Sequence, residues 1–383
     1  MKKEIVFLGL ISILFFISCK SEKFISKKEN GHKIINNKIK KEKEIKNFKV
    51  IKKKKVAIKT KIHLYLHSAN DDKLGIVTYK NSDKYLQLYD KELKLIKEMK
   101  LTNGSGPGEF GSWIPGMGMS ENEIYILDAK KNSIEMFNKE LNFIDSYPIN
   151  SSKFRMSFGF TRVLKLPDSM LVAPVMSMSE DIIGAEMNFD GSLEKYIQGE
   201  EPEGKIKHFN IKNLVRTDIG PENKIYMVMI GYNNKYLLRK YNENLGLVWE
   251  NTVDDGLQKT LSPEIITFKN GTFELNGGRA CSNIEVDNNN LYVLRGVGGI
   301  NKFEWKDNRK VRHHKDIEEI DSGFVDVFDK KTGKFKYRIK GDFLNTKQDY
   351  FLYILDGKYY FVSPYNSKYE NDNTVYVAEI ENK

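Results

Sequence analysis

Three residues near the start of the repetitive part of the chain have the types and spacing of metal ligands. His63, Tyr65 and His67 alternate along one short apolar stretch, so a strand there would project all three side chains to the same side. His208 lies in a second stretch of the same kind. Imidazole nitrogens bind zinc well, so a zinc or calcium site at His63 and His67 is one hypothesis. The alternative is that these polar side chains only line a hydrated channel, and no cofactor is predicted outright.

Arginines recur further along the chain. Arg162, Arg216 and Arg279 each lie on or beside a predicted strand. If they converge, together with His208, they would suit a ligand that carries a carboxylate or phosphate, because a guanidinium binds such groups through two parallel hydrogen bonds. The alternative is structural pairing with nearby acids such as Asp168 and Asp218.

The sequence motifs of several familiar enzymes are absent. The chain contains no P-loop, no G-x-S-x-G, no H-E-x-x-H and no C-x-x-C. A binding function is therefore favoured over catalysis, and the catalytic residues of any enzymatic alternative stay unassigned.

Aromatic residues that precede short polar turns reveal an internal repeat. Phe137 is followed by Asn-Lys-Glu-Leu, and similar turns follow the aromatic residues at 89, 189, 241 and 328. The successive gaps are 48, 52, 52 and 87, and Ile380 comes 52 residues after 328. Repetition at this period is typical of β-propellers and solenoids.

Each repeat reads as four short strands. Apolar and polar residues alternate with a period of two, the strands are rich in Val, Ile, Tyr and Phe, and Gly, Asn and Asp separate them. We therefore expect one all-β domain over residues 47–383. Residues 254–278 and 296–322 interrupt the repeat as insertions, and long loops on a rigid scaffold often carry function.

One loop and the strands after it resemble a known family. Residues 103–110 read NGSGPGEF, and residues 124–137 read IYILDAKKNSIEMF. The pair resembles the pattern of NHL-type propellers, and the match is closest to bacterial six-bladed β-propeller lipoproteins. The resemblance implies six blades of four antiparallel strands. The resemblance also extends to NHL-type propeller lyases, some of which place metal-binding histidines on inner strands.

The two ends of the chain predict how the ring closes. The last repeat reaches Ile380 with only three residues left, so its outer strand is missing. Residues 48–58 contain β-formers and precede the first inner strand without a repeat of their own. Because an unpaired strand edge is a liability, we predict that residues 48–58 pair with residues 374–380 and close the propeller from the N-terminus.

The first residues have the features of an exported lipoprotein. Lys2 and Lys3 precede an apolar run at residues 5–17, and Ser18-Cys19 follows. This order resembles a bacterial lipobox, so residues 1–18 are predicted to be a signal peptide and Cys19 to carry lipid. Residues 20–61 hold 17 Lys and 4 Glu, and residues 19–46 are expected to form a basic, flexible tether.

The distribution of charge and the predicted signal peptide indicate where the protein is located and which partners it has. The net charge of +10 consists of +1 in residues 1–19, +13 in residues 20–61 and −4 in residues 62–383. A mildly acidic body argues against nucleic acid as a partner. We expect a monomer in the cell envelope, lipid-anchored to a bacterial membrane and extracytoplasmic, that binds an unknown protein or carbohydrate as a ligand-binding or protein-interaction module. The alternative is a lyase or glycan-active propeller enzyme that uses His and Arg side chains at the channel mouth.

Overall fold

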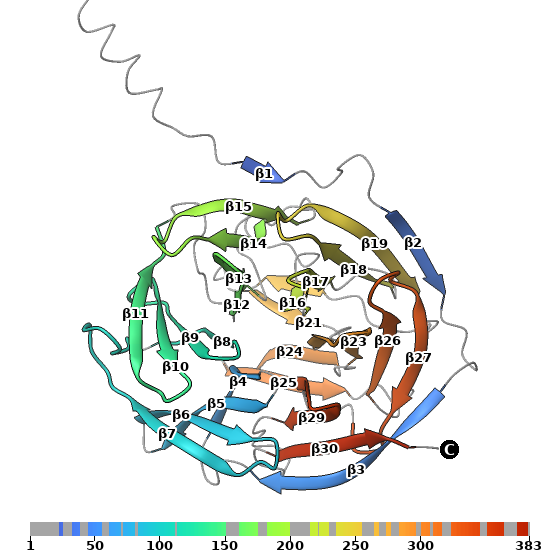
Figure 1. Cartoon of the computed structure of the whole chain (residues 1–383). Helices are drawn as coiled ribbons and strands as arrows, with labels where there is room; N and C mark the ends of the chain where they lie inside the picture. The colour runs from blue at the N-terminus through green and yellow to red at the C-terminus, as the bar shows by residue number, and fades with distance from the viewer. Residues whose placement is uncertain are drawn as a thin grey trace, which may run out of the picture.

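The computed structural model is built of β-strands arranged around a central axis, a β-propeller (Figure 1). It describes residues 23–25, 33–38, 45–55, 61–69, 72–80, 83–111, 113–150, 161–174, 182–199, 215–220, 222–229, 235–254, 264–267, 273–276, 283–295, 300–306, 309–315, 323–344, 351–363 and 374–381. Within these ranges no helix has the length and apolar character needed to cross a membrane.

The unit of the fold is a meander of four antiparallel strands. In chain order the meanders comprise β4 (Lys61–Ala69), β5 (Lys73–Lys80), β6 (Asp83–Asp90) and β7 (Leu95–Leu101); β8 (Gly116–Met119), β9 (Glu123–Asp128), β10 (Ser133–Asn138) and β11 (Phe143–Pro148); β12 (Thr161–Lys165), β13 (Met170–Pro174), β14 (Ile182–Met187) and β15 (Leu193–Gln198); β16 (Val215–Ile219), β17 (Ile225–Met229), β18 (Lys235–Tyr241) and β19 (Leu247–Asp254); β22 (Asn283–Val286), β23 (Asn290–Arg295), β26 (Phe324–Asp329) and β27 (Phe335–Lys340). The last meander joins β28 (Phe351–Leu355), β29 (Lys358–Ser363) and β30 (Thr374–Ile380) to β3 (Ile45–Lys55).

Burial changes from the middle of a meander to its outside. β9 is buried along almost its whole length, whereas the side chains of the outer strand β7 are exposed or half-buried at every position before its last. A strand that is covered on both faces needs apolar residues at every position, which is why the middle strands read as continuous runs such as Ile124–Leu127. The propeller therefore has apolar layers between its meanders.

The apolar layers join each meander to the next and the last to the first. One cluster packs β5, β6 and β7 against β8, β9 and β10, around Leu88 and Ile126. Another packs the β28–β30 side of the ring against β5 and β6, around Leu74 and Val375. Contacts of this kind continue around the whole ring, so burial of apolar surface holds neighbouring meanders together.

The turn between the third and fourth strands explains the repeated sequence signal. In three meanders the side chain of Asp90, Asn138 or Asn242 accepts the backbone N–H four residues later. Leu93 and Leu141 end this turn with positive φ angles of 60° and 64°, a region that most side chains avoid. Their burial offsets that strain, since both are 8% exposed or less.

The third meander departs from the predicted spacing. Its turn runs from Asn188 to Ser192, because Gly191 N–H donates to Asn188 and Asn188 N–H to Ser192. Met187, rather than Phe189, therefore occupies the position of Phe137. The assignment of position 189 was wrong because Phe189 lies within the turn, where its aromatic character imitates the end of a strand.

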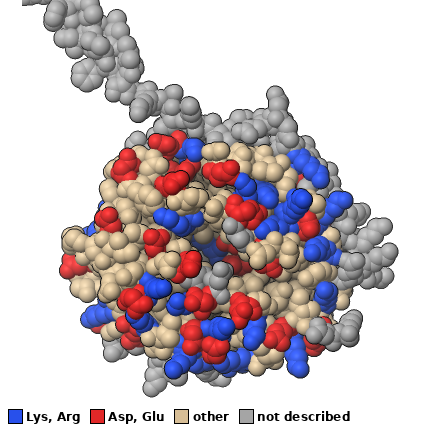
Figure 2. Space-filling view, viewed as in Figure 1, with Lys and Arg blue, Asp and Glu red and all other residues tan. Residues whose placement is uncertain are grey.

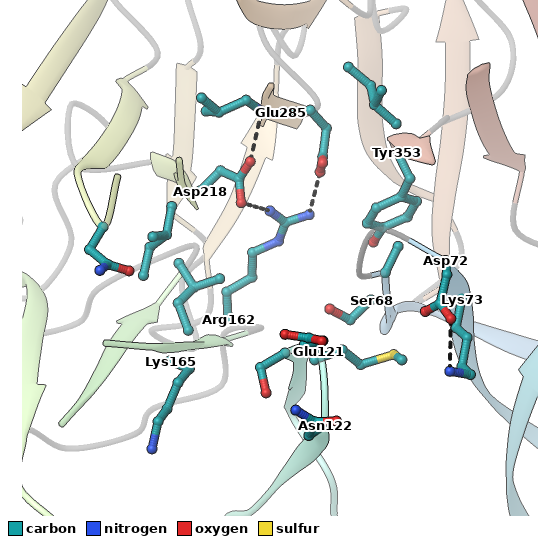
Figure 3. Close-up of a pocket in the computed structure, with 18 of the residues that line it drawn as sticks. Ser68, Asp72, Lys73, Glu121, Asn122, Arg162, Lys165, Asp218, Glu285 and Tyr353 are labelled. Carbon is teal, nitrogen blue, oxygen red and sulfur yellow. Dashed lines mark hydrogen bonds and ion pairs between the residues drawn. The ribbon is translucent and has the colours of Figure 1, made fainter. Parts of the chain in front are cut away.

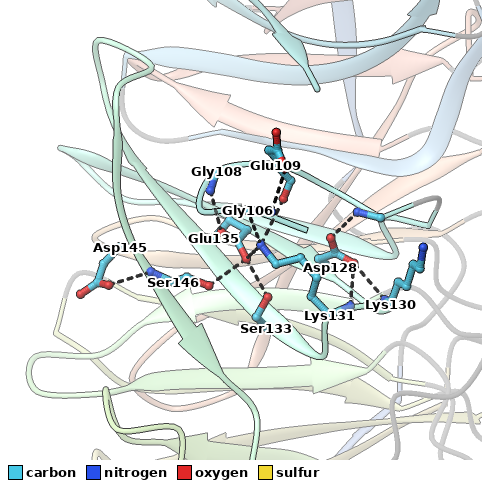
Figure 4. A network of polar contacts seen from close by, with 11 residues as sticks. Gly106, Gly108, Glu109, Asp128, Lys130, Lys131, Ser133, Glu135, Asp145 and Ser146 are labelled. Carbon is cyan, nitrogen blue, oxygen red and sulfur yellow. Dashed lines mark hydrogen bonds and ion pairs between the residues drawn. The ribbon is translucent and has the colours of Figure 1, made fainter. Parts of the chain in front are cut away.

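The glycine-rich loop at residues 103–110 is held by a network of buried charge (Figure 4). Glu109 accepts the N–H of Gly106 at 2.7 Å. Lys131 Nζ donates to the Gly106 and Glu109 carbonyls and lies 2.7 Å from the fully buried Glu135. Because the loop's groups are bonded within the protein, the loop acts as a structural connection between meanders.

The predicted closure is confirmed for residues 48–55 by the pairing of β3 with β30, and residues 56–58 of the predicted strand lie outside the described residues. Phe48 pairs with Ile380 and Lys55 with Thr374 in an antiparallel ladder. The lysines of β3 also fasten neighbouring meanders, since Lys52 and Lys54 donate to the Glu92 and Leu93 carbonyls. Charge at this edge therefore contributes hydrogen bonds as well as solubility.

Two short strands and the start of β3 are described within the segment that was expected to form a flexible tether. β1 (Lys23–Ile25) pairs with β15, β2 (Lys33–Lys38) with β19, and the start of β3 with β27, all in parallel. In Figure 1 these strands follow the outside of the ring. The high content of lysine predicted disorder, but backbone pairing to an open edge depends little on side-chain composition.

Both insertions contain hairpins. β20 (Glu264–Thr267) pairs with β21 (Phe273–Asn276), and β24 (Ile300–Lys306) pairs with β25 (Arg309–Lys315). Each insertion thus adds a two-stranded sheet to the repeat, where the sequence predicted only a long loop.

Replacing Phe48 tests the closure. Phe48 is 6% exposed, and its ring centre lies 5.0 Å from that of Tyr359 and 5.1 Å from that of Phe361. We expect Phe48→Ala to lower the free energy of unfolding by about 3–5 kcal/mol in denaturant titrations. Val50→Ala, on the same strand but 38% exposed, should cost about 1 kcal/mol or less; equal losses would contradict the anchoring role of Phe48.

Candidate functional site

A pocket of about 680 Å³ opens where the inner strands end (Figure 3). Its walls come from the last residues of these strands and from the turns that follow: Ser68, Ala69, Asp72, Lys73, Met119, Ser120, Glu121, Asn122, Leu164, Lys165, Asp218, Ile219, Asn223, Glu285, Val286, Tyr353 and Ile354, with Arg162 and Lys139. Because every meander places the end of its inner strand at the same side of the ring, residues far apart in sequence meet here.

Arg162 is the centre of the pocket. It lies early in β12, and its long side chain extends toward the acids of β16 and β22 (Figure 3). Arg162 Nη2 lies 3.1 Å from Glu285 Oε1, Nη1 lies 3.9 Å from Asp218 Oδ1, and Nη1 also donates to the Thr217 carbonyl at 2.9 Å. One guanidinium thus serves two carboxylates.

The two acids are held in place from their own strands. Asp218 Oδ2 accepts the N–H of Val286 at 2.9 Å, which ties β16 to β22. Glu285 Oε1 accepts a second bond from Asn283 at 3.3 Å. Their side chains are 16% and 13% exposed, so both carboxylates are fixed and largely removed from water.

Burial shifts the protonation of this cluster. It raises the pKa of Asp218 to about 6 despite the opposing effect of Arg162. Burial, reinforced by the charge of Asp218, raises the pKa of Glu285 well above its usual range. Burial opposes the charged form of Arg162, but Tyr353 and the two acids raise its pKa overall. The acids therefore hold protons more readily than exposed carboxyls.

Tyr353 completes the inner wall. Burial raises its pKa, so the phenol stays neutral. The Arg162 guanidinium carbon lies 5.8 Å from the centre of its ring. This distance is within the range of a cation–π contact, so an aromatic face accompanies the charged groups.

The rim carries charges of both signs. Lys73 lies 3.0 Å from Asp72, and Lys165 lies 4.0 Å from Glu123 and 4.1 Å from the centre of the Phe189 ring. On one face of the whole molecule, acidic and basic side chains are also interspersed, around a hollow near its centre (Figure 2). The site is therefore polar with mixed charge.

The structure places some of the site residues predicted from the sequence, and others lie outside the described residues. Arg162 lies in the pocket, and its pairing with Asp218 agrees with the structural alternative considered for it. Arg216 lies on β16 opposite Val228, and His63 and His67 lie on β4, but their side chains are outside the described residues. His208, Arg279 and the lipidation residue Cys19 lie outside them altogether.

The hypothesis of a metal site therefore stays a prediction. Among the residues with described positions, no group of three or more His, Cys, Asp and Glu side chains could hold a metal ion. The described pocket offers instead a guanidinium, two carboxylates and a phenol.

Sequence reasoning did not identify Glu285 and Tyr353 as site residues. Glu285 comes just before the turn that begins at Asp287, and Tyr353 lies within the strand Phe351–Leu355. An available signal was their position, since each lies on an inner strand near the end that faces the pocket. A strand-by-strand alignment of the repeat would have placed them beside Arg162.

Comparisons with known proteins concern the fold. An inferred exported protein of Bacteroides fragilis has a TM-score of 0.53 and 14% identity, with 91% of this chain and 100% of that chain covered. A member of the DUF4221 family from Bacteroides vulgatus has a TM-score of 0.46, 12% identity and coverage of 88% and 100%. Virginiamycin B lyase from Staphylococcus aureus has a TM-score of 0.42, 10% identity and coverage of 87% and 100%.

No protein-family model matches the sequence, and no curated protein is significantly similar to it. At identities this low, the likeness to the Bacteroides fragilis protein shows a shared fold and leaves the function to be inferred from the site.

Replacing Asp218 tests the raised pKa. A carboxyl that binds its proton more tightly in the folded state stabilises the protein below the unfolded pKa, and this stability is lost as pH rises through about 6. A side-chain amide at this position cannot ionise, so Asp218→Asn should remove part of that loss. As the pH rises from 4 to 7.5, the wild type should lose roughly 1–3 kcal/mol more of its free energy of unfolding than the variant loses.

Denaturant titrations at a series of pH values would measure this difference. Asp168→Asn is the matched control, since Asp168 is exposed in the turn between β12 and β13. Parallel pH profiles for the wild type and Asp218→Asn would show that Asp218 has an ordinary pKa.

Proposed function

We propose that this chain is a lipid-anchored, extracytoplasmic propeller of six NHL-like blades that binds a small polar ligand in the pocket around Arg162. The observation that carries the binding function is the 680 Å³ pocket with its fixed guanidinium, two carboxylates and phenol. Concave sites with a few convergent polar groups are the usual binding sites of proteins. The closed cycle of apolar layers supports the blade count.

The leader supports the location. Lys2 and Lys3, the apolar run at residues 5–17 and Cys19 have the order of a lipoprotein signal. The similar protein of Bacteroides fragilis is an inferred exported protein. A monomer held to a bacterial membrane through lipid on Cys19 fits these observations.

A second candidate function is catalysis. Asp218 and Glu285 have raised pKa values in a pocket, and such groups suit general acid–base chemistry near neutral pH. A lyase or glycan-active enzyme would use one as the base and the other as the acid. Turnover that Glu285→Gln abolishes, in a chain that still binds ligand, would favour this function over binding alone.

Narrowing the pocket tests the binding function. Asn122 is exposed on the wall of the pocket, so Asn122→Trp should add a bulky ring there without disturbing the core. In a thermal-shift screen of small polar metabolites, we expect compounds that stabilise the wild type to lose most of their effect on this variant. Asn142→Trp, on an exposed turn outside the pocket, should respond as the wild type does. A screen without hits, or hits unaffected by Asn122→Trp, would count against the pocket.

Mass spectrometry tests the anchor. Protein isolated from membranes should begin at Cys19 and carry the added mass of acyl chains, because more than one chain is needed for stable anchoring. Cys19→Ser should release the protein into the soluble fraction. An unmodified Cys19, or cleavage at another residue, would rule out this anchor.

A further inference from the structure

The inner end of the pocket has more negative than positive groups. Asp218 and Glu285 both face the single guanidinium of Arg162, at 3.9 Å and 3.1 Å. With both acids ionised, the three groups carry a net charge of −1. Because each is at most 18% exposed, water screens this charge poorly.

Arg162 has little capacity for an anionic ligand. It bonds to Glu285 and to the Thr217 carbonyl, and its guanidinium lies against Tyr353. An incoming carboxylate or phosphate would compete with two fixed carboxylates and would be repelled by them. The arrangement therefore opposes the carboxylate- or phosphate-bearing ligand that the arginines suggested in the sequence.

The lysines at the rim do not reverse this balance. Lys73 has Asp72 at 3.0 Å, and Lys165 has Glu123 at 4.0 Å. The two remaining charged side chains of the wall, both exposed, are one acid, Glu121, and one base, Lys139. Positive charge at the mouth is thus compensated locally. Among the described side chains, Arg162 alone offsets the two acids at the inner end when both are ionised.

We propose that the pocket takes a ligand that carries a protonated amine, bound between the carboxylates of Asp218 and Glu285 and the ring of Tyr353. This inference rests on the proposed binding function and specifies its ligand class. Charge-assisted hydrogen bonds to carboxylates and a cation–π contact with an aromatic face are the two interactions that recognise ammonium groups. The cavity supplies both within one wall.

Binding of the amine is expected to depend on pH. Asp218 and Glu285 must both be ionised to present the negative charge, and among the described residues the titratable groups that face them are Arg162 and Tyr353. Since the pKa of Asp218 is raised to about 6 and that of Glu285 well above its usual range, acid removes the attraction. The amine therefore binds more tightly at pH 7.5 than at pH 5.

Three probes with one skeleton and different charges test the ligand class. Benzylamine, benzyl alcohol and benzoate are compared by ligand-observed NMR titration and thermal shift on the full-length wild type. At pH 7.5 we expect benzylamine to bind at least tenfold more tightly than either of the others, and to weaken at least threefold at pH 5, where it remains protonated. Glu285→Gln, which keeps the shape of the side chain, should weaken benzylamine about tenfold.

Glu194→Gln is the matched control, since Glu194 is exposed on β15 and outside the pocket. Tighter binding of benzoate, or equal binding of all three probes, would overturn the ligand class and leave the binding function intact. Failure of all three, when the metabolite screen still has hits that Asn122→Trp abolishes, would overturn the ligand class alone. An empty screen as well would overturn both proposals.

Discussion

The turn between the third and fourth strands is the constraint on which the rest of the ring depends. In the meanders that contain Asp90, Asn138 and Asn242, one side-chain oxygen binds the N–H four residues on and closes the turn. The pairing register shifts next to each of these turns, as at Phe137, which pairs with Phe143. That shift decides which face of the outer strand is buried. An error there would misplace the apolar layers, and with them the inner strands that carry the pocket.

The pocket is formed by residues from several meanders, so it exists only when the ring is assembled. Arg162, Asp218, Glu285 and Tyr353 come from β12, β16, β22 and β28. The backbone of each strand is fixed by its own meander, so the side chains near its end are free to differ between strands. Closure of the ring brings these ends together, and the hydrogen bond from Val286 to Asp218 shows how closely two of them approach.

Local pattern was enough to predict most of the fold. Alternation with a period of two placed the strands, as in residues 247–253, and the missing fourth strand of the last repeat predicted the β3–β30 ladder. The pocket is a different case. Arg162 was identified from its residue type. Its ion pairs with Asp218 and Glu285, however, join strands more than fifty residues apart in the sequence, and no local pattern encodes them. The strands β1 and β2 were missed because backbone pairing leaves little trace in a lysine-rich sequence.

The β3–β30 ladder also determines when the molecule can be complete. A ribosome makes β3 among the first of the described strands and β30 as the last of them. Every other meander can form as its own strands emerge, but the final one must wait for the whole polypeptide. A chain terminated before β30 would retain β3 without that partner, and its unpaired strand edges would be open to pairing with other chains. The closure thereby distinguishes finished molecules from fragments.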